Sequence, residues 1–325
     1  MRRLLQAILY LFIVFLLVGC SAQTSRADNE FNIENYSVAR SGKRVMVYYI
    51  MDGFLTPVTY TIDDSELEVN AALNLLFSGI TPDGFESHVL GAQLNAMKVS
   101  GDTVSLDISG DPFQGEKGEL AKSQIVFTLT DCPNILNVSI SVDGDTYWES
   151  LKRPTYINLI DPDTYQQDME NPEELDKYIT IYYPDKTAKY LIPITIKSDK
   201  IQIVEDQDKS PTIKAAHLAE VAMQHLMEGA NEIGLGFDEK MIKSLQVKDG
   251  VAIVDLNRHI LLNKFSTKTQ YAEIAIKAVV RTLTSIDGID KVQFLVDGVK
   301  MGYITGNINI QNPIGPDKWY NSLTD

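Results

Sequence analysis

Residues 135–144 read ILNVSISVDG, and residues 289–298 read IDKVQFLVDG. Five positions are identical at a constant offset of 154 residues, including the closing Val-Asp-Gly. In each stretch apolar residues recur at every second position before the Asp-Gly pair, which is typical of a strand that ends in a tight turn. A pattern that returns after this interval predicts that the chain contains one fold twice.

Three further pairs of segments occur in the same order in both halves of the chain. Residues 47–49 match 181–183 at an offset of 134, residues 75–79 match 225–229 at 150, and residues 104–108 match 252–256 at 148. The order is kept while the offset drifts, as expected for a duplication followed by loop insertions. The sequence therefore predicts two tandem domains of one fold.

Each copy is predicted to contain two strands, a helix, a hairpin, a second helix and a closing strand. In the first copy the strands are residues 45–49 and 58–62, the helix ends at Gly79, the hairpin turns at 101–102, the second helix includes 120–129 and the closing strand includes 138–142. In the second copy the strands are residues 179–183 and 191–196, and the helix ends at Gly229. The hairpin turns at 249–250, the second helix includes 274–279 and the closing strand includes 292–296.

Helix boundaries are predicted from capping residues. In the first copy a capping box at residues 65–68 begins the helix and Gly79 ends it. In the second copy Ser210 is the cap, Pro211 takes the first helical position and Gly229 ends the helix. The implied fold class is α+β: two tandem copies of a two-layer sandwich, each a small mixed β-sheet with two helices on one face.

Composition limits the classes of protein to which the chain can belong. It has 325 residues, of which 44% are hydrophobic and 22% charged, as in globular proteins with room for about two domains. Its formal net charge of −15 argues against nucleic-acid binding, which requires cationic side chains that neutralise phosphates. We expect no nucleic-acid partner.

The first twenty residues have the features of a secretory leader. Arg2 and Arg3 precede an apolar run at residues 4–18, which is too short to span a bilayer, and the run ends in LVGC at residues 17–20. These four residues resemble a bacterial lipobox, which implies a covalent diacylglycerol and a fatty acyl chain, such as palmitate, on Cys20. The alternatives are an ordinary cleaved signal peptide or an uncleaved N-terminal helix.

The predicted domain organisation has five parts. They are a signal peptide at residues 1–19, the lipidated Cys20 with a flexible tether at 20–43, a first domain at 44–149, a linker at 150–177, and a second domain with a C-terminal tail at 178–325. The linker is rich in Pro, Asp, Glu and Gln, and the tail from residue 307 is expected to wrap back over the second domain. The tether has a root-mean-square span of roughly 25–30 Å.

Motifs of catalysis are missing from the sequence. It contains no G-x-S-x-G, no H-E-x-x-H and no G-x-x-x-x-G-K. His217 and His225 share a predicted helix, but eight residues separate them by about 12 Å, which is too far to hold one metal ion by themselves. Cys132 is expected to be a buried apolar side chain rather than a nucleophile. We expect no catalytic, cofactor or metal site.

Two aspartates occur at matching positions in each copy. Asp107 matches Asp255, and Asp143 matches Asp297. The alternative is an acid–base pair between the domains, but turn chemistry explains why each copy has its own. We therefore interpret Asp107 and Asp255 as acceptors for backbone amides, and the pairs Asp143-Gly144 and Asp297-Gly298 as structural turns.

The repeated unit resembles the GerMN domain. The resemblance rests on the opening Tyr-Tyr strand, the apolar helix ending at Gly79 or Gly229, the hairpin strand with its Asp, and the closing Val-Asp-Gly. Two such domains after a lipobox are typical of a family of sporulation and germination lipoproteins. The resemblance implies a fold similar to ring-building motifs, and a role beside the channel that joins mother cell and forespore.

The preferred hypothesis is a membrane-anchored, extracytoplasmic assembly or scaffold protein that is not an enzyme. Its partners would be the membrane, through the lipid, and other envelope or sporulation-channel proteins, with self-association as a further expectation. It would lie on the extracytoplasmic face of the cell membrane, which is the outer forespore membrane if it acts only in sporulation. The alternatives are a solute-binding envelope lipoprotein and a cell-wall enzyme.

Overall fold

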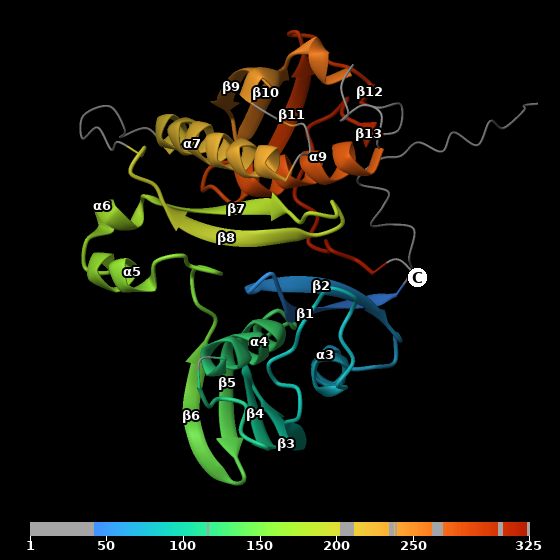
Figure 1. The fold of residues 1–325 in the computed structure, drawn as a ribbon, viewed down its shortest axis with the longest axis vertical. Coiled ribbons are helices and arrows are strands. Elements are labelled where there is room, and N and C mark those ends of the chain that lie inside the picture. Colours follow the sequence, from blue (N-terminus) through green and yellow to red (C-terminus); the bar gives the residue numbers. More distant parts are fainter. Residues whose placement is uncertain are drawn as a thin grey trace, which may run out of the picture. The chain divides into compact units, whose positions relative to one another are not determined.

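The computed structural model describes residues 42–115, 117–201, 211–233, 237, 239–261, 269–304 and 308–323 (Figure 1). All of them belong to one compact unit, residues 31–325. The predicted signal peptide, Cys20, almost all of the tether and the cap Ser210 lie outside the described residues. Within the described ranges, no helix is both long and apolar enough to cross a membrane.

The first repeat runs from β1 to β6. Its elements are β1 (Lys43–Met51), β2 (Phe54–Ile62), α3 (Glu68–Phe77), β3 (Gln93–Ser100), β4 (Thr103–Ser109), α4 (Gly118–Thr130), β5 (Asn137–Val142) and β6 (Asp145–Lys152). Two short helices follow, α5 (Pro162–Asp168) and α6 (Pro172–Leu175). The segment predicted as a linker, residues 150–177, thus contains the end of β6 and both of these helices.

The second repeat runs from β7 to β11. Its elements are β7 (Tyr178–Pro184), β8 (Leu191–Lys197), α7 (Pro211–Glu232), η1 (Glu239–Met241), β9 (Ile242–Lys248), β10 (Val251–Leu256), η2 (Arg258–Leu261), α9 (Thr269–Thr284) and β11 (Lys291–Val296). The tail adds β12 (Tyr303–Ile304) and β13 (Ile308–Asn309). The predicted order of elements is confirmed in both repeats.

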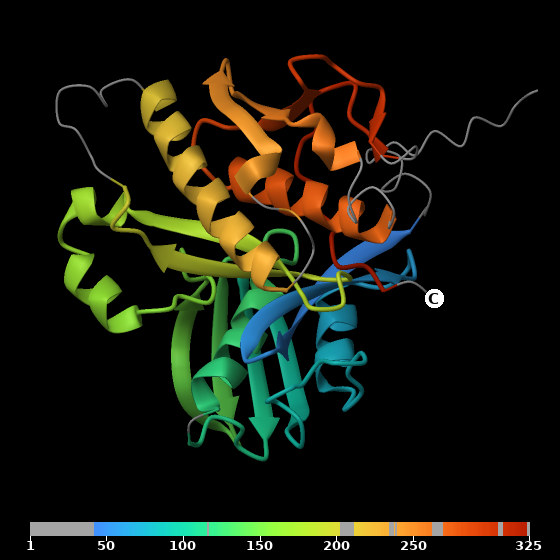
Figure 2. The same cartoon turned by 45° about the horizontal axis from the view of Figure 1, so that its top comes forward.

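Each repeat has a mixed sheet. The first has the order β3-β4-β5-β6, with β4 and β5 parallel and the other pairs antiparallel. The second has the order β11-β10-β9, with β10 and β11 parallel. The α+β class is therefore confirmed. The opening hairpins β1–β2 and β7–β8 form two-stranded sheets of their own, and the helices of each repeat pack against both its hairpin and its mixed sheet (Figures 1 and 2).

The predicted strand alternation places the core. Val45, Val47 and Tyr49 of β1 face one buried cluster together with α3, α4 and the mixed sheet. Met46 and Tyr48, on the opposite face, belong to another cluster with Phe127. Both faces of β1 are therefore covered, which explains why the strand is an almost continuous apolar run.

The tail completes the second repeat. Val292 of β11 pairs with Ile314, where the first repeat pairs Val138 with Leu151 of β6. Ile308 and Ile310 are fully buried in the core of the second repeat. The predicted wrapping of the tail over the second domain is confirmed, and the tail takes the place that β6 has in the first repeat.

Two predicted helix boundaries are wrong. The Ser65 hydroxyl donates to Asp63 Oδ1 at 2.6 Å instead of capping, and α3 begins at Glu68 with no side-chain cap. Helix α7 continues past Gly229 to Glu232. A Cβ on Gly229 would lie 2.5 Å from the Tyr183 ring, so the glycine permits close packing of the helix on β7 and does not end it.

Candidate functional site

The repeated carboxylates each bind the closing turn of their own repeat. The Gly144 amide donates to Asp107 Oδ1 at 2.9 Å, and the Gly298 amide donates to Asp255 Oδ1 at 2.8 Å. Asp143 and Asp297 occupy the turns with φ of 50° and 51°. Aspartate tolerates the left-handed backbone at positions 143 and 297. At positions 107 and 255 its carboxylate is the acceptor for a backbone amide.

Asp297 has an additional role that Asp143 lacks. Its carboxylate accepts from Lys243 Nζ at 2.9 Å and also forms an ion pair with Arg258. The Arg258 guanidinium, followed by Lys243, lowers the pKa of Asp297 to about 2. The second repeat therefore ties its closing turn to β9 and η2, two elements that precede it in the chain.

One Ser-His-Glu set lies at the end of β8. His225 Nε2 is 3.1 Å from Ser198 Oγ, and His225 Nδ1 is 3.6 Å from Glu228 Oε2. Burial, followed by the nearby Lys200, lowers the pKa of His225. Ser198 is only 3% exposed, so its hydroxyl is buried against the His225 ring. Among the described residues, no group of three His, Cys, Asp or Glu side chains could hold a metal ion.

In each repeat a buried threonine binds a backbone amide on the first strand of the opening hairpin, at the edge that does not pair with the second strand. The Tyr48 amide of β1 donates to Thr128 Oγ1, and the Tyr182 amide of β7 donates to Thr282 Oγ1, each at 3.0 Å. Gln124 of α4 also donates to the Tyr48 carbonyl at 3.0 Å. These helix side chains replace a neighbouring strand, so β1 and β7 do not present a free edge there.

The main junction between the repeats lies along the other two edges, β2 and β8. Pro57 in β2 and Pro193 in β8 are buried and lack amide hydrogens, so a direct ladder between these strands would miss donors. Two segments supply them. We call residues 156–160 the first crossing segment and residues 319–323 the second crossing segment.

Asn158 of the first crossing segment bridges the two hairpins. Its Oδ1 accepts from the Leu55 amide at 2.8 Å. Its Nδ2 donates to the Leu55 carbonyl at 2.7 Å and to the Pro193 carbonyl at 2.6 Å. Both amide hydrogens are used, and the φ of 51° is one that Asn tolerates.

Asn321 of the second crossing segment makes the mirror set of bonds. Its Oδ1 accepts from the Leu191 amide at 2.8 Å, and its Nδ2 donates to the Leu191 carbonyl at 2.8 Å and to the Pro57 carbonyl at 2.9 Å. Its φ is 55°, and the residue is 8% exposed. Each asparagine thus binds both backbone groups of a leucine in its own repeat and a proline carbonyl in the other.

Each crossing segment also adds a short parallel pairing to the opposite repeat. Leu159 bridges Thr195 of β8, and Ser322 bridges Thr59 of β2. The Thr195 hydroxyl donates to the Ile157 carbonyl at 2.8 Å, and the Thr59 hydroxyl donates to the Tyr320 carbonyl at 2.6 Å. The two repeats therefore hold each other through backbone groups on both sides of the junction.

Aromatic side chains and two arginines surround this junction. The Arg153 guanidinium lies 4.4 Å from the centre of the Phe127 ring and donates to the Tyr48 hydroxyl at 2.7 Å. The Arg281 guanidinium lies 3.4 Å from the centre of the Tyr320 ring. Burial raises the pKa of Tyr320 well above its ordinary value. The arginines cover the rings that anchor the junction.

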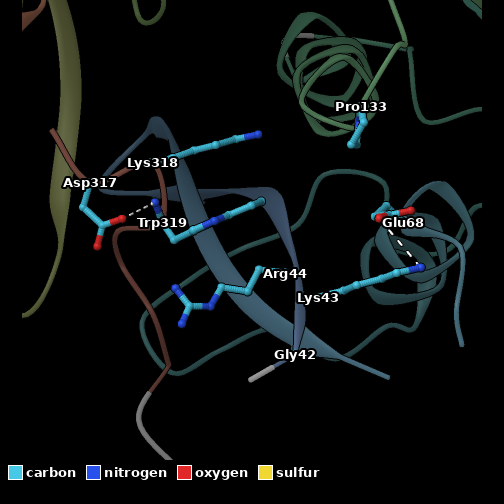
Figure 3. A pocket seen from close by; sticks show the side chains of 8 residues that line it. All are labelled: Gly42, Lys43, Arg44, Glu68, Pro133, Asp317, Lys318 and Trp319. Carbon is cyan, nitrogen blue, oxygen red and sulfur yellow. Dashed lines mark hydrogen bonds and ion pairs between the residues drawn. The ribbon is translucent and has the colours of Figure 1, made fainter. Parts of the chain in front are cut away.

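A pocket of about 500 Å³ lies beside the second crossing segment (Figure 3). Lys43 Nζ in its wall donates to the Glu66 carbonyl at 3.1 Å and lies 3.9 Å from Glu68. Lys318 Nζ lies 4.6 Å from the centre of the Trp319 ring. The pocket is lined by basic side chains (Lys43, Arg44 and Lys318) together with acidic ones (Glu68 and Asp317).

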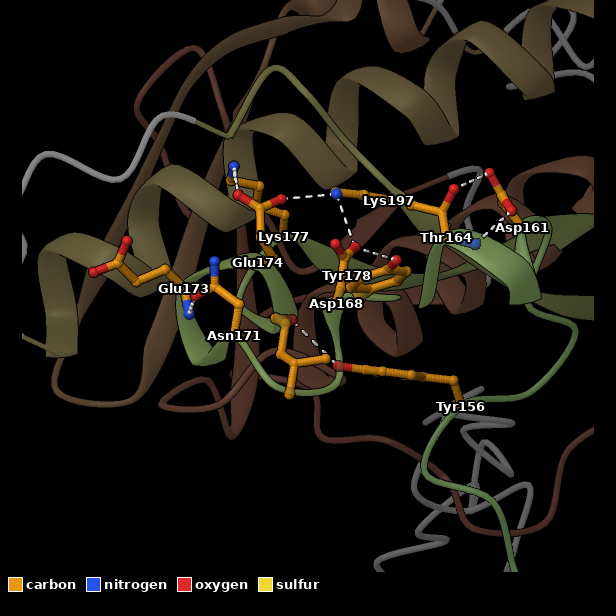
Figure 4. A network of polar contacts seen from close by, with 11 residues as sticks. Tyr156, Asp161, Thr164, Asp168, Asn171, Glu173, Glu174, Lys177, Tyr178 and Lys197 are labelled. Atoms are coloured by element: carbon orange, nitrogen blue, oxygen red, sulfur yellow. Dashed lines mark hydrogen bonds and ion pairs between the residues drawn. The ribbon is translucent and has the colours of Figure 1, made fainter. Parts of the chain in front are cut away.

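A second polar network fastens α5 and α6 to β7 and β8 (Figure 4). Lys197 Nζ lies 2.8 Å from Asp168 and 2.7 Å from Glu174. The Tyr178 hydroxyl donates to Asp168 at 2.7 Å, and the Tyr156 ring stacks on Tyr178. The two lysine contacts raise the pKa of Lys197, so the ion pairs favour its charged form.

Sequence reasoning did not find the crossing segments, although the signals exist. Leu-x-Pro-x-Thr occurs at residues 55–59 and again at 191–195, an offset of 136. Thr-Leu-Thr occurs at 128–130 and 282–284, at the same offset of 154 as the closing strands. An aromatic residue lies two positions before Asn158 and Asn321. Only the fold shows that these patterns meet.

Known proteins agree with this architecture. A sequence profile of the Germane family, described as sporulation and spore germination, matches residues 42–147 and 180–302. The spore germination protein GerM of Bacillus subtilis (strain 168) is 22% identical over 276 residues, covering 77% of this chain and 70% of that protein.

Two solved structures are similar in fold. The tandem GerMN domains of the sporulation protein GerM from Bacillus subtilis superpose with a TM-score of 0.52 at 18% identity, covering 87% of this chain and all of that one. The first GerMN domain alone matches 34% of this chain and 98% of its own length, with 21% identity and a TM-score of 0.30. The profile covers most of the chain and both repeats, and the chain therefore belongs to the Germane family of sporulation and spore germination proteins.

Proposed function

We propose that this protein is a lipid-anchored, extracytoplasmic assembly module that acts in sporulation or spore germination and catalyses no reaction. The observation that carries the proposal is the reciprocal junction of Asn158 and Asn321. It holds two copies of one fold in a fixed relation, as a scaffold requires, by satisfying the buried backbone groups of both hairpins. Family membership supplies the cellular process.

The outer parts of the mixed sheets are the surfaces that such a module would offer to partners. Strand β3 is an edge strand of the first repeat and β9 an edge strand of the second. Most side chains of β3 are exposed. An extended segment of an envelope or sporulation-channel protein can bind such an edge by strand addition.

The proposed lipid anchor rests on the LVGC stretch at residues 17–20, which precedes the described residues. One acyl chain holds a protein to a membrane only weakly, whereas the two lipid groups of a bacterial lipoprotein anchor it stably. Labelling the host with palmitate should mark the wild-type protein and not the Cys20→Ala variant. If both variants are labelled equally, or neither is, Cys20 does not carry the anchor.

The scaffold role is tested by replacing the gene in the spore-forming host. Deletion should reduce heat-resistant spores and disturb assembly of the channel between mother cell and forespore, and the wild-type gene should restore both. Normal spores, normal channels and normal germination after deletion would contradict the proposal. Spores that form normally but germinate slowly would place the role in germination.

The enzyme alternative is tested by an Asp107→Asn, Asp255→Asn double variant. Because both carboxylates accept backbone hydrogen bonds, we expect a less stable protein that still supports sporulation when it is folded. A fully folded variant that fails to restore spores would favour a cell-wall enzyme. The solute-binding alternative would use the pocket of Figure 3, and a thermal-shift screen of small solutes and cell-wall fragments tests it.

A further inference from the structure

The edge of β2 that does not pair with β1, which we call the outer edge of β2, is bound by the second crossing segment, far away in the sequence. The Thr59 amide donates to the Asn321 carbonyl at 3.2 Å, the Thr59 hydroxyl donates to the Tyr320 carbonyl at 2.6 Å, and Asn321 Nδ2 donates to the Pro57 carbonyl at 2.9 Å. The first of these contacts joins backbone to backbone and belongs to the short parallel pairing of Thr59 with Ser322, so the segment lies along β2 as an added strand would.

Side-chain anchors accompany the backbone contacts. Trp319 and Tyr320 pack against the cluster of Met46, Tyr48 and Phe127. The Tyr320 ring also contacts the Tyr182 ring, with centres 5.8 Å apart. The second crossing segment therefore combines a backbone bond to the strand edge with half-buried aromatic side chains, which are the two features of an extended peptide bound to a sheet edge.

The outer edge of β2 requires asparagine at position 321, the middle residue of the second crossing segment. The Pro57 carbonyl and the Leu191 carbonyl on the facing strand both accept from Asn321 Nδ2. A carboxamide offers two hydrogens and one oxygen in a side chain of the right length. Aspartate has no donor, and its charge would face two carbonyl oxygens, so the edge discriminates strongly between the two residues.

We propose that the outer edge of β2 is a peptide-accepting site that can take the second crossing segment of a second copy of this chain in place of its own. Every copy offers both the edge and the matching segment, and exchange keeps each contact unchanged, which is the condition for low-cost swapping between protomers. The proposal deepens the assembly role and rests on it for its cellular meaning.

The site is tested with the soluble chain from Ser21 to Asp325 that carries Tyr320→Ala and Asn321→Asp. These changes remove the Tyr320 ring and the Asn321 carboxamide from the cis segment, so it competes less for the edge. A fluorescent peptide of residues 315–323 should bind this variant at least about tenfold more tightly than it binds the wild-type chain, because the wild-type edge is occupied. Circular dichroism checks folding, and Asn321→Ala replaces the double variant if that variant unfolds.

A peptide with Asn321→Asp is the matched control. It should bind the double variant about 100-fold more weakly, since it loses two hydrogen bonds and places a charge against carbonyl oxygens. Equal binding of both peptides, or no binding of the native peptide at 1 mM, would overturn the proposed site.

The second copy is tested by light scattering of the wild-type chain from micromolar to millimolar concentration. A dimer that forms with rising concentration and disappears in the Tyr320→Ala, Asn321→Asp variant is expected. A wild-type chain that stays monomeric throughout would overturn exchange between copies, even if the peptide binds. Neither measurement uses spores, so a failure here is distinct from a failure of the proposed sporulation role.

Discussion

Asn158 and Asn321 lie 163 positions apart and make equivalent hydrogen bonds to opposite hairpins. Each satisfies the amide and the carbonyl of a leucine and the carbonyl of a proline. The two sets of bonds are reciprocal, because each asparagine joins a leucine of its own repeat to a proline of the other. The junction therefore depends on two residues that can be tested individually.

Asn321→Ala should lower the free energy of unfolding by about 3 kcal/mol, because it leaves buried backbone donors and acceptors without partners. Asn158→Ala should cost somewhat less, about 2 kcal/mol, since Asn158 is only half-buried. Urea unfolding of the soluble chain measures both. The exposed Asn312→Ala is the control and should change stability by less than about 0.5 kcal/mol. Equal effects of all three variants would mean that the junction carries no special stability.

Thr128→Val and Thr282→Val should each destabilise the protein by about 1–3 kcal/mol, because the isosteric change leaves the Tyr48 or Tyr182 amide buried without an acceptor. Thr130→Val is a matched control on the same helix. Its hydroxyl donates to the Val126 carbonyl within α4 and accepts from Arg153 Nη1 at 3.4 Å, so no backbone amide loses its acceptor and we expect a smaller effect. Thermal unfolding by circular dichroism distinguishes the variants, and a Thr130 effect as large as that of Thr128 would contradict the assignment.

Asp297→Asn should destabilise the protein at neutral pH, with an effect that fades in acid. The folded-state pKa of Asp297 is about 2, below its ordinary value of 3.8, so its contribution is complete above about pH 4 and is lost as the pH falls through about 2. Because Arg258 is mostly exposed, added salt should weaken the effect. Urea midpoints between pH 2.5 and 7 give the profile. Asp143→Asn, at the same turn position of the first repeat, is the matched control for the substitution itself.

Lys197→Met should loosen α5 and α6, because it removes the cation shared by Asp168 and Glu174. Limited proteolysis should then cleave within residues 153–177 several-fold faster than in the wild type. Lys200→Met removes an exposed pair with Glu228 outside this network and serves as the control. Equal cleavage of both variants would show that the Lys197 network does not hold the helices.

Cys132 should react very slowly in the folded protein. Burial, followed by nearby Asp131, raises the pKa of its thiol to about 12, so the reactive thiolate is scarce at pH 8. A soluble chain from Ser21 contains no other cysteine. Thiol labelling at pH 8 should be about 1,000-fold slower in buffer than in guanidinium chloride. Rapid labelling of the native protein would show that the side chain is accessible.

The sequence predicts the secondary-structure elements better than it predicts the contacts between the two repeats. The strands of the closing stretch, the turns at Asp143-Gly144 and Asp297-Gly298, and the start of α7 at Pro211 follow from local patterns. Gly229 misled because a glycine can end a helix or allow close packing, and only the Tyr183 ring against it distinguishes the two. The capping box failed because Asp63 binds the Ser65 hydroxyl, which the spacing of the box does not reveal.

The sequence alone determined that one α+β unit occurs twice, because alternation, turn residues and repeats are read among near neighbours in the chain. The tertiary structure decided how the two units hold each other. Asn158 and Leu55 are 103 positions apart, and Asn321 and Pro57 are 264 apart. The partner of an asparagine over such distances is set by which buried backbone groups lack a hydrogen bond after the strands have packed, and no local pattern contains that information.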